Sequence, residues 1–167
     1  ESLAKIGDVS IAPLLENFYQ KDKEGRFWIL NALRRLNAEV ARSIFLSLCK
    51  DEDVDIQLLS ISALSEFESS EESLEVLLEL LDHDLWRVRN ESARTLSRLR
   101  DLSPEFVIRQ LQEGFENRKY WMIKVMEQRS DSIFIKPLLS IFKGDDWVLK
   151  TAAADALQKI PYKDSAD

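Results

Sequence analysis

Glycine and proline are scarce in this chain of 167 residues, which contains four of each. Sandwiches and barrels need turns rich in both residues at short intervals, so the shortage argues against a β-rich fold. Four scattered glycines also leave little material for a glycine-rich phosphate-binding loop. Apolar residues make up 45% of the chain and charged residues 32%, which is enough apolar material to bury a core.

Cysteine and histidine are nearly absent, with Cys49 and His83 the single examples. One cysteine cannot form an internal disulfide, which fits a reducing compartment, and we expect a cytoplasmic protein. One histidine cannot supply the paired ligands of common zinc sites. We interpret Asp82-His83-Asp84 as a polar turn and helix cap, and Cys49 as a core residue. The sequence therefore predicts no enzyme, no cofactor and no metal.

Long apolar runs are also missing, since none approaches the roughly 18 residues of a membrane span. No signal peptide is visible, and we expect no membrane partner. The 30 acidic residues outnumber the 23 basic ones, which gives a net charge of −7. Nucleic-acid binders are usually basic, so this total argues against one while leaving room for a local basic face.

What the chain does have is an internal repeat of about 31 residues. A first apolar column consists of Leu15, Leu46, Leu78, Ile108 and Leu139. A second column follows each of these residues 18 positions later, at Leu33, Leu64, Leu96, Met126 and Leu157. Apolar residues within each unit lie three and four apart, which is the period of an amphipathic helix. Each unit is therefore predicted to be a pair of helices.

The predicted helices alternate between a first and a second member of each pair. First helices are expected near 10–20, 40–50, 72–82, 104–115 and 134–143, and second helices near 24–37, 54–67, 86–100, 117–129 and 147–160. The turn within each pair is polar, and its Asp and Asn residues can cap the second helix. One pair cannot bury its apolar face alone, whereas stacked pairs can, so the pattern predicts an all-α solenoid.

The repeat resembles the HEAT repeat, most closely the short type called PBS-lyase HEAT-like. Two units carry the resemblance most clearly, Leu77–Leu96 and Pro137–Leu157. The resemblance implies a single repeat domain over 1–161, with units at about 8–37, 38–68, 69–101, 102–130 and 131–161. Residues 1–7 then resemble the end of a preceding unit, so we expect the natural protein to continue upstream, and 162–167 form a polar tail. The family's basic position early in the second helix holds Arg26, Arg89, Lys119 and Lys150, whereas Gln57 departs from it.

Charge is distributed unevenly between the two helix types. Second helices with their adjoining residues carry 14 bases and seven acids, whereas the rest of the chain carries nine bases and 23 acids. The HEAT resemblance implies that second helices line the concave side, which predicts a basic inner surface and an acidic back. An alternative stays open, because these bases can instead pair with acids of neighbouring repeats or with helix C-termini.

Aromatic residues add a second feature. Arg26-Phe27-Trp28-Ile29-Leu30 and Lys119-Tyr120-Trp121-Met122-Ile123 are near copies, three repeats apart. One member of each aromatic pair is expected to face out of the core, where it can anchor a protein interface. The alternative is that both rings fill gaps between helices. Trp86 and Trp147, which begin second helices, are interpreted as structural.

The leading hypothesis is a non-enzymatic scaffold, part of a larger protein, whose concave face binds an acidic protein or peptide. The candidate contacts are Trp28, Arg35, Asn90, Arg94, Arg98, Tyr120, Trp121 and Lys124. A nucleic-acid-binding module resembling the HEAT-like DNA glycosylases is one alternative, which the acidic total disfavours. A lyase or chaperone subunit for a bilin chromophore is another, suggested only by the PBS-lyase resemblance.

Overall fold

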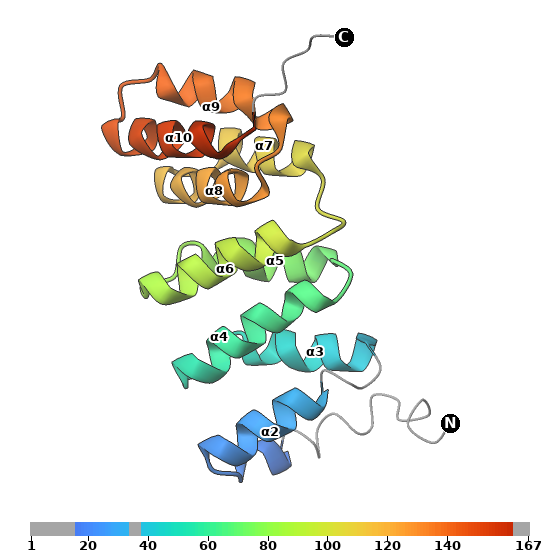
Figure 1. Ribbon diagram of the computed structural model, residues 1–167. Helices are drawn as coiled ribbons and strands as arrows, with labels where there is room; N and C mark the ends of the chain where they lie inside the picture. Colours follow the sequence, from blue (N-terminus) through green and yellow to red (C-terminus); the bar gives the residue numbers. More distant parts are fainter. Residues whose placement is uncertain (1–15, 34–37, 162–167) are drawn as a thin grey trace. The chain divides into compact units, whose positions relative to one another are not determined.

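A computed structural model describes residues 16–33 and 38–161, and the regular structure in these ranges is entirely helical (Figure 1). Residues 16–19 are helical and precede the first fully described helix. The α-helices and the two short 3-10 helices are α2 (Lys23–Leu33), α3 (Ala38–Leu48), α4 (Val54–Ala63), η3 (Leu64–Glu66), α5 (Glu71–Leu80), α6 (Trp86–Arg98), α7 (Pro104–Glu113), α8 (Glu116–Arg129), η4 (Ser132–Phe134), α9 (Ile135–Phe142) and α10 (Trp147–Lys159). The predicted all-α fold of helix pairs is confirmed.

Side-chain caps explain where several helices begin. Asp53 accepts a hydrogen bond from the backbone N–H of Asp55 at 3.0 Å, and Asp146 accepts one from Leu149 at 3.0 Å. Both satisfy N–H groups that have no partner inside the helix. His83 has the same kind of local role, because its Nδ1 accepts from the N–H of Leu85 at 3.1 Å. The interpretation of Asp82-His83-Asp84 as a polar turn agrees with this bond, but the expected helix cap is wrong, because α6 begins after Leu85 without a side-chain cap.

The chain divides into two compact units, residues 1–67 (unit 1) and 68–167 (unit 2). The boundary lies one residue before the predicted junction between the second and third repeats. In unit 1, α4 packs against both α2 and α3. Its core contains Ile44 and Ile61, and the Phe45 and Phe67 rings lie 6.0 Å apart between centroids.

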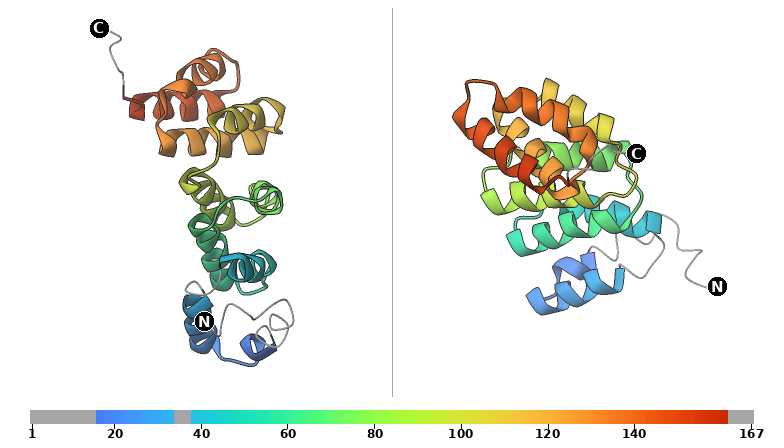
Figure 2. Two further views of the ribbon diagram at one scale, coloured as in Figure 1. Left: turned by 90° about the vertical axis from the view of Figure 1, so that its right-hand side faces the viewer. Right: turned by 45° about the horizontal axis from the view of Figure 1, so that its top comes forward.

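Unit 2 consists of three helix pairs, α5 with α6, α7 with α8, and α9 with α10. The second helices α6, α8 and α10 form one layer and the first helices form the other, as the left view of Figure 2 shows for this unit. Second helices pack closely on one another, whereas first helices contact each other less. Small residues make this close approach possible, because Ala93, Thr95, Ala153 and Ala156 are buried in the layer. Helices on the inner side of a curved stack approach most closely, so within unit 2 this packing supports the expected placement of the second helices.

The basic position early in the second helix has a structural role. The Arg26 guanidinium donates to the carbonyls of Lys21 and Tyr19, at 3.0 and 3.2 Å. Arg89 donates to the carbonyls of His83 and Asp84, at 2.6 and 2.7 Å. Gln57, which departs from the basic pattern, donates from its amide to the Cys49 carbonyl at 2.9 Å. Arg26, Arg89 and Gln57 thus share a long donor that satisfies carbonyls between the two helices of a pair, and Gln57 does so without a positive charge.

Cys49 is fully buried in unit 1, and burial raises the pKa of its thiol to about 12. The reactive species towards a disulfide reagent is the thiolate, which is then very scarce at pH 8. We expect the native chain to react with Ellman's reagent only as fast as unit 1 opens, at least about 100-fold more slowly than in urea. The absorbance of the released thiolate measures this rate. Complete labelling of the native chain within the time of the unfolded control contradicts the prediction.

Candidate functional site

The solvent-facing side of α6, α8 and α10 forms one surface, which we name the second-helix face. Exposed or half-buried residues recur on each helix at spacings of three and four, so they lie on one side of it. The face comprises Trp86, Asn90, Arg94 and Arg98 from α6, Asn117, Tyr120, Lys124 and Gln128 from α8, and Trp147, Thr151, Asp155 and Lys159 from α10.

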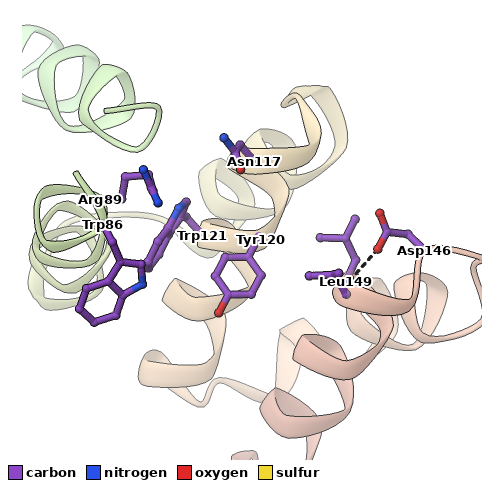
Figure 3. A pocket seen from close by; sticks show the side chains of 8 residues that line it. Trp86, Arg89, Asn117, Tyr120, Trp121, Asp146 and Leu149 are labelled. Carbon is purple, nitrogen blue, oxygen red and sulfur yellow. Dashed lines mark hydrogen bonds between the residues drawn. The ribbon is translucent and has the colours of Figure 1, made fainter. Parts of the chain in front are cut away.

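At the N-terminal ends of these helices the face contains a hollow of about 410 Å³, which we name the aromatic pocket (Figure 3). The Trp86 and Trp121 rings stand 6.4 Å apart between centroids, and Tyr120 meets Trp121 edge-on at 5.2 Å. The pocket is lined by Trp86 and Arg89 from α6, Asn117, Tyr120 and Trp121 from α8, and Asp146, Val148 and Leu149 from α10.

Contacts with the backbone hold the walls of the pocket in place. Arg89 is fixed by its bonds to two turn carbonyls, and its guanidinium carbon lies 6.0 Å from the centre of the Trp121 ring. Trp121 is only 4% exposed, so it forms a rigid floor. Asp146 is committed to capping α10 (Figure 3). Because these groups are fixed, a ligand meets a preformed site and little ordering entropy is lost on binding.

Large apolar side chains are exposed around this pocket. Trp86 is 58% exposed and Trp147 is 74% exposed. Leu85, Phe115 and Val148 are also exposed, and all five residues lie at the beginning of a second helix. Clustered exposed aromatic and aliphatic side chains are costly in water and mark interaction surfaces.

Many bases of the second helices are paired, as the open alternative expected. Arg118 pairs with Asp82 of the preceding repeat at 2.7 Å, and Arg129 donates to the carbonyls of Leu99 and Leu102 at 3.1 and 3.0 Å. Arg94 and Arg98 differ, because both are exposed and form no ion pair with another residue of the described ranges. The positive charge available on the second-helix face is therefore concentrated on α6.

Glu127 is a buried carboxylate that joins α8 to α10. Lys124 contacts its Oε2 at 2.7 Å, and Lys159 of α10 contacts its Oε1. Burial alone would raise the pKa of Glu127, but hydrogen bonds from the two lysines outweigh burial and hold the pKa below its ordinary value of 4.5. The same contact raises the pKa of Lys124 against the effect of its burial. Glu127 therefore stabilises unit 2 in its ionised form.

We expect Glu127→Gln to lower the free energy of unfolding at pH 7 by about 1 kcal/mol, because solvent screens the exposed Lys159. A depressed carboxyl pKa contributes stability above the unfolded value of 4.5, and this contribution is lost as pH falls through the folded value. The difference between the two proteins should therefore be full at pH 7 and shrink below about pH 4. Urea unfolding at several pH values measures it. A difference that stays constant down to pH 3 contradicts this role.

Unit 2 brings together six of the predicted contact residues, which the structure places on α6 and α8. Arg94 and Arg98 are exposed, whereas Asn90, Tyr120 and Lys124 are half-buried. Arg35 lies outside the described residues, and Trp28 belongs to unit 1, where it is 64% exposed.

Three tryptophans need correction. Trp121 was expected to contact a partner, but it is 4% exposed, because Trp86 and Arg89 of α6 pack beside it, and it lines the pocket. Trp86 and Trp147 were interpreted as structural, and this was wrong, because both are largely exposed. The sequence did contain a signal that Trp86 and Trp147 are exposed. Each stands ten residues before the core column, about 80° from its direction at 100° per residue, and side chains at a first helical residue point beyond the helix end.

The remaining chemistry of the described residues is sparse. No cluster of three or more His, Cys, Asp or Glu side chains able to hold a metal ion occurs among them. Within the same ranges, no helix has the length and apolarity needed to cross a membrane. The second-helix face thus offers aromatic surface, guanidinium groups and a preformed hollow, which are groups suited to binding.

The sequence pattern of HEAT repeats matches residues 11–97 and again residues 44–120. The two matches together span about two thirds of the chain. A search of curated proteins finds no match to it.

Proposed function

This chain belongs to the HEAT-repeat family, whose members are generally protein-interaction scaffolds, and we propose that it binds a protein through the second-helix face of unit 2. The main support for this proposal is the group of exposed aromatic residues around a preformed pocket. Trp86 and Trp147 each leave more than half of a large apolar surface in water. Burying such surface against a partner is the main favourable term in association.

The proposal extends to the nature of the scaffold. It acts without catalysis, as HEAT-repeat proteins typically do. We place it in the cytoplasm, because its single cysteine fits a reducing compartment. Arg94 and Arg98 favour a partner that carries negative charge opposite α6, because both bases are exposed. Such charges raise the association rate and select partners more than they add affinity.

A site-specific photo-crosslinker distinguishes the two layers of unit 2. It is placed singly at Arg94 or Tyr120 on second helices, and at Glu75 or Arg109, which are exposed on the first helices α5 and α7. In an extract of the native source we expect protein adducts from Arg94 and Tyr120. We expect none from Glu75 and Arg109. Adducts from Glu75 and Arg109 alone, or adducts with nucleic acid in place of protein, overturn the proposal.

A further inference from the structure

The aromatic pocket and the exposed arginines of α6 lie on the same face, at opposite ends of one helix. The pocket opens beside Trp86, at the first residue of α6, and Arg98 is its last residue. Arg94 stands two turns after Trp86, and both arginines are exposed. One continuous strip of surface therefore offers an apolar hollow followed by two positive charges.

The pocket has the size and lining of a site for one large side chain. Its volume of about 410 Å³ is near the lower end of ordinary ligand pockets. The rings of Trp86, Tyr120 and Trp121 line it, and Leu149 adds an aliphatic wall. Aromatic rings pack well against another ring or a branched aliphatic group.

The charges near α6 favour acidic residues beside that side chain. Arg89 is committed to the turn carbonyls, which leaves Arg94 and Arg98 to meet a ligand. The acids in reach are Glu91, half-buried on α6 itself, Asp146, which lines the pocket while it caps α10, and Asp155 on α10, which lies with Lys124 beside Tyr120. A carboxylate over α6 therefore meets a net positive surface.

The distance from Trp86 to the two arginines of α6 sets the distance between the apolar anchor and the acidic residues of a ligand. Trp86 and Arg94 are eight residues apart, or about 12 Å along the helix, and Arg98 is about 18 Å away at 1.5 Å per residue. An extended peptide covers about 3.4 Å per residue. Acidic residues about four and five or six positions from the anchor would thus reach Arg94 and Arg98.

We propose that the ligand of this surface is an extended peptide segment of a partner protein, with one bulky apolar anchor in the aromatic pocket and acidic residues about four to six positions away, opposite Arg94 and Arg98. This rests on the proposed function and specifies the chemistry of the partner. The apolar anchor supplies most of the affinity, and the acidic residues select the register.

The probe is a fluorescent Gly/Ser peptide that carries one Phe, with two Asp residues beginning about four positions from it. One peptide set places the Asp pair after Phe and another places it before, because either chain direction satisfies the geometry. Control peptides replace Phe by Ser, replace both Asp by Lys, or move the Asp pair next to Phe. Fluorescence anisotropy with the whole chain at about 50 mM salt measures the dissociation constants, since low salt preserves the charge contribution.

Protein variants assign the contacts. We expect Trp86→Ala to weaken binding at least about tenfold, and Arg94→Glu combined with Arg98→Glu to weaken it about tenfold. Arg109→Glu is the matched control, because Arg109 is an exposed base on α7, in the other layer. It should leave binding within about twofold of the original value. Circular dichroism verifies that each variant keeps its helices.

The outcomes separate this inference from the proposed function. Binding that needs Phe, the Asp pair and their spacing supports the inference. Binding that ignores the Asp pair or its spacing overturns it, as does equal binding by the Lys peptide. If no peptide binds while Arg94 and Tyr120 still crosslink to a protein, the extended-peptide inference fails and the protein-binding face stands. If neither experiment succeeds, both fail.

Discussion

Replacing Trp121 by alanine should lower the free energy of unfolding of unit 2 by about 3–5 kcal/mol, the range typical of removing a buried aromatic ring. Trp121 is 4% exposed and packs between Trp86, Tyr120 and the Arg89 guanidinium. Its removal leaves a cavity at the junction of α6 and α8, which neighbouring helices fill only in part. A domain is stable by about 5–15 kcal/mol, so the loss is a large fraction of the total.

The matched control is Trp28→Ala, in the near copy of the same motif. Trp28 is 64% exposed, so its removal should change stability by no more than about 0.5 kcal/mol. Urea unfolding followed by circular dichroism gives the two free energies, and amide hydrogen exchange in α8 assigns the loss to unit 2. Equal losses for the two variants, or a larger loss for Trp28→Ala, contradict the difference in burial.

Replacing both Trp86 and Trp147 by alanine should raise the dissociation constant of a partner identified by the crosslinking experiment at least about 30-fold. This is the effect of losing one strong interface anchor. Both rings are largely in water in the free protein. Removing them should therefore cost little stability, at most about 1 kcal/mol, chiefly from the contact of Trp86 with Trp121. This variant is thus expected to lose affinity for the partner while its free energy of unfolding stays nearly unchanged.

The measurement is a titration of the purified partner, together with thermal unfolding of the same preparation. Phe142→Ala is a suitable control, since Phe142 is an exposed aromatic residue at the end of the first helix α9. It should leave the affinity within about twofold. If the double variant instead unfolds far below the original chain and binds normally once folded, the two tryptophans are structural after all and the binding face lies elsewhere.

The helix pairs themselves follow from local pattern. Apolar residues within each unit recur with the period of an amphipathic helix, and Leu33, Leu64 and Leu96 of the second column are buried. Polar turns and Asp caps such as Asp53 and Asp146 then set where the second helices begin. These features depend on residues only a few positions apart, so they can be predicted without knowing the neighbours.

The role of the basic position early in the second helix was harder to predict from the sequence. Arg26, Arg89 and Gln57 all donate to carbonyls between the two helices of their pair, although one of them is uncharged. From the sequence, the bases at this position were counted toward a basic inner surface, and Gln57 was interpreted as a departure from the pattern. The hydrogen bonds show that Gln57 fills the same donor role as Arg26 and Arg89.

The sequence by itself determined that the chain is a series of helix pairs, and the second apolar column is buried at Leu33, Leu64 and Leu96. It did not determine the first column, where Leu139 is 40% exposed, or the starts of α6 and α8, which have no side-chain cap. Only the tertiary structure decided which aromatic residues face water. Trp28 and Trp121 stand in near-identical local sequences, yet one is exposed and the other buried. The reason is that burial depends on the helix packed alongside: α6 covers Trp121, and no local pattern encodes such a neighbour. Likewise Trp86 and Trp147 reach solvent because they begin their helices, and their exposure defines the candidate binding surface.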